Sequence, residues 1–310
     1  MKGESRLTEQ LNRQEISLSE LFSALWQGKL TIVIGALFFA LLSVAIALYL
    51  PNQYKSKTTL IINTESTSKL ASLAGGLGGL AGIAGINLGS GQDGANPLIA
   101  KELVTSQAFI LEFVNKHNIL VPLMAAQEWD IASGELILDN SLYDSERKLW
   151  LYGDNPTQET RPKKEDIVKE FKDVIRLSED TKTGVLTMTA EFYSPVLAQQ
   201  WLTMFINDIN ETIRQHDVEQ SSKSIEYLKG LIDETSNRHF QETFNTLIEE
   251  QTKKLMLSKV RDDYVFKPID PPNIPEKKSK PLRAIICVVG TFLGGILMSL
   301  FVLIRYFTRK

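Results

Sequence analysis

The chain has 310 residues, a formal net charge of −3 and one cysteine, Cys287. A slightly acidic chain with no lysine-rich face argues against a nucleic-acid partner. One cysteine excludes an intramolecular disulfide and a cysteine-based metal site, and we interpret Cys287 as a small apolar packing residue.

Residues 1–30 form a polar arm whose second half carries a helix-start signal. Ser17 can cap a helix, and Glu20 follows three residues later, as in a capping box. Apolar side chains then recur on one helical face as far as Trp26. This pattern predicts a helix in the membrane interface, although a surface helix shares it.

Residues 31–50 are uncharged and apolar, and about 20 such residues cross a bilayer. A cleaved signal peptide is the alternative, because Ala45 and Ala47 form an A-x-A pattern. The preceding arm is long and carries several glutamates, which suits a signal peptide poorly. We therefore expect a retained first transmembrane helix.

A second apolar segment, residues 282–304, precedes a short basic tail, residues 305–310. Basic residues in the tail and in the amino-terminal arm favour both termini in the cytoplasm. Further cations just before the second segment, on the opposite side, count less because long loops translocate largely regardless of charge. Residues 51–281 are then expected in the periplasm.

Residues 70–94 combine apolar side chains with many glycines. Each glycine costs a helix about 1 kcal/mol relative to alanine, so a mobile loop near the membrane is the favoured interpretation. A re-entrant segment and a third span are the alternatives, because Gly75 with Gly79 has the spacing of packed membrane helices. The segment lacks the lysine of a phosphate-binding loop.

Strand and helix patterns alternate through the rest of the middle region. Residues 54–62 and 184–194 alternate as strands, and residues 262–270 read as a short strand that returns to the same sheet. Residues 96–118 and 164–177 have helical spacing. The order predicts an α+β domain.

Residues 195–260 are predicted to be a very long projecting helix that begins at Ser194-Pro195. Its apolar positions follow helical spacing, and Gly230 is its only glycine. One continuous helix would reach roughly 90 Å, and two helices joined near Gly230 are the alternative. The distal part must stand in solvent or pack against other subunits.

Residues 268–281 form a proline-rich collar, which cannot continue a helix and stiffens the connection to the second apolar segment. Within that segment Gly290 and Gly294 are four residues apart, with Gly295 beside them, a spacing that lets two membrane helices pack closely, so we expect close packing against the first span. The predicted site residues are Pro268, Pro271, Pro272, Pro275 and Pro281 in the collar, and Gly290, Gly294 and Gly295 in the span.

Residues typical of catalysis do not converge in the sequence. His117, His216 and His239 lack metal-ligand spacing, and the carboxylates are distributed along helix faces. Neither a nucleophile elbow nor a Walker motif occurs. We expect no catalytic residue, no cofactor and no metal, and a structural or regulatory role.

Three stretches carry a resemblance that covers nearly the whole chain: "ISLSELFSALWQGK", "LPNQYKSKTTLII" and "KPIDPPNIPEKKSKPLRAIICVVGTFLGGIL". In this arrangement the chain resembles the chain-length determinant (Wzz) proteins, the polysaccharide co-polymerases of bacterial inner membranes. The absence of a nucleotide-binding domain favours the class without a cytoplasmic kinase.

The resemblance implies an α+β base near the membrane, a long projecting helix and a closed homo-oligomer. It implies that the protein sets the modal chain length of a lipid-linked surface polysaccharide, most simply lipopolysaccharide O-antigen. The implied partners are an inner-membrane polymerase, the growing polysaccharide and membrane lipid, with no nucleic acid. A two-span periplasmic sensor and an export-machine adaptor are the alternatives.

Overall fold

The computed structural model describes residues 22, 25–62, 97–152, 160–260 and 263–309. The chain divides into a helical unit, residues 1–51 with 280–310, and a mixed unit, residues 52–279. The capping signal at Ser17 and the glycine-rich segment 70–94 lie outside the described residues.

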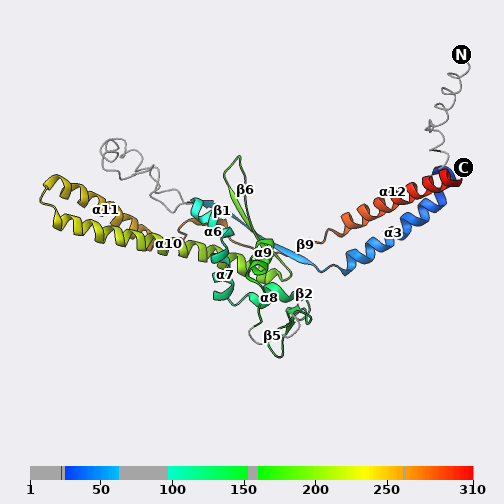
Figure 1. Ribbon diagram of the computed structural model, residues 1–310, viewed down its shortest axis with the longest axis horizontal. Coiled ribbons are helices and arrows are strands. Elements are labelled where there is room, and N and C mark those ends of the chain that lie inside the picture. Colours follow the sequence, from blue (N-terminus) through cyan, green and yellow to red (C-terminus); the bar gives the residue numbers. More distant parts are fainter. Residues whose placement is uncertain (1–21, 23–24, 63–96, 153–159, 261–262, 310) are drawn as a thin grey trace, which may run out of the picture. The chain divides into compact units, whose positions relative to one another are not determined.

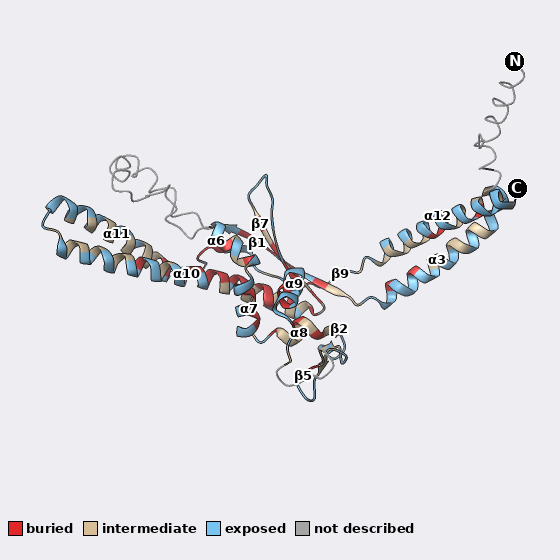
Figure 2. Cartoon of the chain, in the orientation of Figure 1, coloured by how far each residue is buried: buried red, intermediate tan, exposed pale blue. Residues whose placement is uncertain are grey.

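The helical unit consists of α3 (Lys29–Tyr49) and α12 (Arg283–Arg309), which lie side by side (Figure 1). Both helices are long and apolar enough to cross a membrane. Most of their large apolar side chains are exposed (Figure 2). α12 continues as a helix through Arg309, beyond the expected end of the second span at residue 304.

The mixed unit is built on an antiparallel sheet in the order β6–β7–β1–β8, with β9 also paired to β1. Tyr54 lies opposite Phe192 and Leu60 opposite Leu186, so the apolar residues of β1 and β7 share one face. The two predicted strands and the returning strand are thereby confirmed. The strands are β1 (Gln53–Ile62), β6 (Ile175–Glu179), β7 (Leu186–Phe192), β8 (Phe266–Asp270) and β9 (Lys278–Lys280).

Two helices cover the apolar face of this sheet. The first part of α10 (Pro195–Glu234) packs on β1 and β7, and α9 (Lys164–Val174) packs on β6 and β7. Ser194 caps α10 by accepting a hydrogen bond from the Leu197 N–H (3.3 Å), so the predicted helix start is confirmed. Between helices and sheet lies the core, in which the Phe113 and Phe205 ring centroids are 5.0 Å apart.

The helix expected over residues 96–118 is two helices, α6 (Pro97–Thr105) and α7 (Gln107–Lys116). Ser106 separates them because its backbone is extended and its hydroxyl accepts the Phe109 N–H (3.5 Å), which starts a new helix. Short elements follow at the edge of the unit: α8 (Leu120–Ala125), the hairpin β2 (Ala126–Asp130) with β3 (Glu135–Leu138), and the hairpin β4 (Tyr143–Asp144) with β5 (Leu149–Trp150).

The expected continuous helix over 195–260 is wrong: α10 ends at Glu234, and α11 (Arg238–Val260) folds back along it (Figure 1). The break lies at residues 235–237, not at Gly230, which is inside α10. Asn237 starts α11 by accepting the His239 N–H (3.0 Å), while the Thr235 carbonyl accepts the Gln241 side chain (2.8 Å). Short polar side chains that bond the local backbone favour such a break.

Candidate functional site

The two apolar helices meet through glycines. A Cβ added at Gly290 would lie 2.6 Å from Ser43 Cβ, and one added at Gly294 would lie 2.7 Å from Phe39 Cγ. Real Cβ atoms do not approach so closely, so only glycine allows this separation of α3 and α12. The structure therefore brings two of the three predicted span glycines to the helix contact.

The first span contributes small residues to the same contact. A Cβ at Gly35 would lie 2.8 Å from Met298 Sδ, so a glycine on α3 faces a long side chain on α12. Ser43 is buried and donates its hydroxyl to the Phe39 carbonyl (2.5 Å), which satisfies its polar group inside the helix pair. Gly35 faces Met298 while Ser43 faces Gly290, so the two helices run antiparallel.

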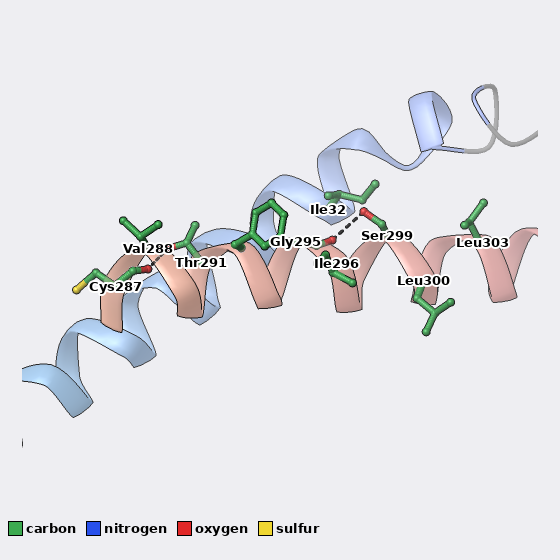
Figure 3. Close-up of a pocket in the computed structure, with 10 residues that line it drawn as sticks. Ile32, Cys287, Val288, Thr291, Gly295, Ile296, Ser299, Leu300 and Leu303 are labelled. Carbon is green, nitrogen blue, oxygen red and sulfur yellow. Dashed lines mark hydrogen bonds between the residues drawn. The ribbon is translucent and has the colours of Figure 1, made fainter. Parts of the chain in front are cut away.

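Gly295 is not part of this contact, because nothing lies within 4 Å of a Cβ added there. It lines an open apolar groove of α12 with Cys287, Thr291 and Ser299, seen in Figure 3. The hydroxyls of Thr291 and Ser299 donate to the carbonyls of Cys287 and Gly295, each at 2.7 Å. The second span thus has one face packed on α3 and another that is open.

Most of the proline-rich collar is docked along the sheet. Pro268 lies in β8 opposite Leu60, and Pro275 is buried. The Pro272 carbonyl accepts the Gln199 side chain (3.4 Å) from α10. Pro271 is exposed, and Pro281 belongs to the helical unit. The structure therefore does not bring all five prolines into one site.

Two buried hydroxyls of β1 hold the collar in place. Thr58 Oγ1 donates to the Asp270 carbonyl (2.6 Å) and Ser56 Oγ to the Asn273 carbonyl (2.8 Å). Both residues are almost completely buried. Their role is not predicted from the sequence, although polar residues at the inward positions of an alternating strand are a usable signal.

Polar side chains of α10 also fix the point where the chain enters β8. Asn210 Oδ1 accepts the N–H groups of Val265 (3.0 Å) and Phe266 (2.8 Å), and its Nδ2 donates to the Phe266 carbonyl (2.8 Å). Asp217 accepts the Tyr264 hydroxyl (2.7 Å) and lies 3.3 Å from Lys254 Nζ on α11. Neither residue was singled out from the sequence.

Two of the three histidines, His117 and His216, lie beside carboxylates. His117 Nε2 is 2.8 Å from Asp208 Oδ2, and Lys116 Nζ is 2.9 Å from Asp208 Oδ1. His216 Nδ1 lies 3.8 Å from Asp217. Within the described ranges, no group of three histidine, cysteine or acidic side chains could hold a metal ion.

Shifted carboxyl pKa values mark local hydrogen bonds. The Ser133 hydroxyl and the Ala132 N–H lower the pKa of Asp130 in the β2–β3 turn. A hydrogen bond from Arg214, one helical turn further along α10, lowers the pKa of Glu211. These carboxylates are held ionised by neighbours in the chain, which is typical of turns and helix surfaces and not of a catalytic acid.

Residues 14–117 match the family model of the Wzz chain length determinant proteins, which confirms the resemblance over that part of the chain. No match was found among curated proteins. A solved full-length bacterial polysaccharide co-polymerase is 14% identical, with a TM-score of 0.37, and the match covers 94% of this chain and 98% of that one. A fragment of WzzB, a polysaccharide co-polymerase from Salmonella Typhimurium, is 11% identical, with a TM-score of 0.31, and the match covers 74% of this chain and all of the fragment.

Proposed function

From the match of residues 14–117 to the Wzz family, we propose that this protein regulates the modal chain length of a lipid-linked surface polysaccharide, the O-antigen of lipopolysaccharide. The family match is the observation that carries the proposal. The protein itself forms no glycosidic bond. A partner polymerase extends the polysaccharide, and this protein determines where extension stops.

The proposed location is the bacterial inner membrane, with both termini in the cytoplasm and the mixed unit in the periplasm. Two observations support it. Both α3 and α12 have the length and apolarity of membrane spans, and they run antiparallel, so residues 52–279 leave and re-enter at the same face. Arg305 and Arg309 lie in the last turns of α12, as expected for a cytoplasmic end.

The proposed active form is a closed homo-oligomer that contacts the polymerase. The α10–α11 pair supports subunit contacts, because it exposes large apolar side chains at Tyr227, Phe240 and Met256. The open groove of α12 beside Gly295 supports a further helix contact within the membrane.

Gene deletion with complementation tests the proposal directly. Lipopolysaccharide from the deletion strain, run on a silver-stained gel, should lose its preferred O-antigen length, and the wild-type gene should restore it. An immunoblot of membranes is the control that the complementing protein is present. An unchanged ladder of every surface polymer would reject length control and leave the sensor or the export adaptor.

Reporter fusions test the topology independently. Alkaline phosphatase fused after Asn52 should be active, because the enzyme needs the periplasm, and a fusion after Lys310 should be inactive. Activity at Lys310 would overturn the arrangement with both ends inside.

A further inference from the structure

Four exposed lysines gather where β1 and β9 pair, and we call them the lysine cluster: Lys55, Lys57, Lys277 and Lys278. On β1 the alternation is strict. Tyr54, Ser56 and Thr58 are buried beneath the helices, so Lys55 and Lys57 point to the opposite face of the sheet. No described helix packs on that face.

Hydrogen bonds of Lys278 and Ser279 hold β9 at this place, and Lys277 immediately precedes the strand. Lys55 lies directly opposite Glu191 on β7, and Glu191 Oε1 accepts the Ser279 hydroxyl (2.5 Å). Ser279 also donates to the Gln53 carbonyl (3.1 Å), and Lys278 Nζ donates to Asn52 Oδ1 (3.3 Å). Both ends of the mixed unit therefore meet in one cationic surface.

The cluster carries an excess of positive charge. The neighbouring carboxylates are Glu191, opposite Lys55, Asp270, opposite Thr59, and Glu276, next to Lys277 in the chain, which leaves the four ammonium groups in excess. Among the ion pairs of the described residues, none involves a lysine of the cluster; Lys278 reaches only a neutral amide. Because like charges on neighbouring strands repel one another, an anionic partner would stabilise this arrangement.

The positions of these lysines in the chain indicate which kind of anion binds the lysine cluster. Lys55 follows the last residue of α3, Tyr49, by six residues, and Lys277 precedes the first residue of α12, Arg283, by six. Six extended residues reach at most about 20 Å, so chain connectivity keeps the cluster close to the bilayer surface. Cations are normally depleted beside the translocated ends of membrane helices, which sets this cluster apart.

We propose that the lysine cluster binds the phosphates of anionic phospholipid headgroups at the outer surface of the membrane. The proposal rests on the topology of the proposed function. Ammonium groups pair with phosphate oxygens by charge-assisted hydrogen bonds. Each lysine near an anionic lipid surface strengthens binding by about fivefold.

Native mass spectrometry of the full-length protein in neutral detergent tests this binding. Phosphatidylglycerol and phosphatidylcholine with identical acyl chains are titrated against the wild type and against the variant K55Q/K57Q/K277Q/K278Q. The matched control, K182Q/K229Q/K253Q/K259Q, removes four exposed lysines elsewhere in the mixed unit. We expect wild type and control to prefer phosphatidylglycerol by at least tenfold, and the cluster variant to lose that preference.

Retained preference in the cluster variant, or equal loss in the control, would overturn the proposal. Two further probes separate sources of phosphate: inorganic phosphate at equal concentration should not displace phosphatidylglycerol, and an isoprenyl diphosphate should not bind more tightly through the same lysines. Either contrary result would overturn the assignment to phospholipid. Neither the polymerase nor the O-antigen enters this assay, so its failure is distinguishable from a failure of length control.

Discussion

The molecule contains two pairs of antiparallel helices that differ in the residues at their contacts and on their outer surfaces. In α3–α12, glycines and a serine lie at the contact, and large apolar side chains such as Leu37 and Phe292 point outward. In α10–α11, charged residues point outward, and Asp217 joins the two helices through Lys254. The first pair suits lipid, where close backbone packing drives association, and the second suits water.

A second contrast lies within α10. Its first half enters the core, whereas after Ile213 only Ser221 is buried, so the far half depends on α11 for its packing. At the base of the pair, Asn210 adds hydrogen bonds to residues 265 and 266, and Asp217 adds contacts to Tyr264 and Lys254. The residues of α10 that are buried are Ala198, Trp201, Leu202, Phe205, Ile206, Ile209, Asn210, Ile213 and Ser221.

The largest expected effect is at Asn210. Asn210→Leu keeps the side-chain size but leaves the buried N–H groups of Val265 and Phe266 and the Phe266 carbonyl without this partner. Unpaired buried groups cost about 1–3 kcal/mol each, so we expect the free energy of unfolding of the mixed unit to fall by about 4 kcal/mol. Thermal unfolding of the full-length protein in detergent, followed by near-ultraviolet circular dichroism, measures it.

The matched control for that substitution is Asn207→Leu, an exposed asparagine one turn earlier on the same helix. Its stability should stay near that of the wild type. Equal destabilisation by both variants would show that the hydrogen bonds from Asn210 to residues 265 and 266 do not stabilise the mixed unit.

Substitutions at two adjacent glycines, Gly294 and Gly295, test the packing of α3 against α12. Gly294→Leu forces a side chain into Phe39, and such overpacking costs about 3 kcal/mol of helix association. Disulfide formation between Ile46→Cys and Ile286→Cys, which line the cleft between α3 and α12, reports the packing in a Cys287→Ser background. We expect the cross-linked fraction to fall sharply.

Gly295→Leu is the control in the same background. A Cβ there has nothing within 4 Å and opens onto the groove, which is lined by α12 residues and by Ile32 of α3, so cross-linking should remain near the wild-type level. Under the proposed function this variant should still change O-antigen length if the groove contacts another helix. Equal loss of cross-linking in both variants would contradict the conclusion that one face of α12 packs on α3 and another is open.

A smaller effect is expected at Asp217, where the charge contact between α10 and α11 is concentrated. Asp217→Ala removes a bond to the Tyr264 hydroxyl and an ion pair with Lys254, at a site that is only 13% exposed. A hydrogen bond to a charged group contributes about 2 kcal/mol, so α11 should open more easily. Hydrogen exchange of α11 amides should accelerate accordingly.

Glu219→Ala is the matched control for Asp217. Its partner Lys223 and Glu219 itself are both about two-thirds exposed, so this ion pair contributes little. Unchanged hydrogen exchange in Asp217→Ala, or the same acceleration in both variants, would show that Asp217 does not stabilise the contact between α10 and α11.

The sequence predicts those parts of the fold that rest on a local repeat. Alternation identifies β1 and β7, and Ser194 with proline marks the start of α10, because each signal is contained in neighbouring residues. The break at 235–237 carries neither glycine nor proline. There Asn237 Oδ1 accepts the His239 N–H and the Thr235 carbonyl accepts the Gln241 side chain, and short polar residues that can form such local bonds also occur on helix surfaces, so the letters alone do not mark the break.

The candidate site is predicted less completely because its contacts depend on the partner element. Gly294 and Gly295 are the same residue type and neighbours in the sequence. Their positions differ by about 100° around the helix, so only one of them can face α3. Asn210 likewise stands beside an apolar stripe with nothing nearby in the sequence to identify the backbone that it binds. Its partners lie 55 and 56 residues away.

The smallest expected effect is at Gly230. Its substitution distinguishes a turn at residues 235–237 from a hinge at Gly230 as the cause of the fold-back of α11 on α10. Gly230 lies inside α10 and a Cβ there meets nothing within 4 Å, so Gly230→Ala should stabilise the helix by about 1 kcal/mol. Hydrogen exchange around residue 230 should slow, and the fold-back at 235–237 should be retained. A hinge at Gly230 predicts the reverse, because alanine would stiffen the turn and disturb the pairing of Asp217 with Lys254. Slower exchange with an intact α10–α11 contact therefore places the turn in the three polar residues and makes Gly230 dispensable for it.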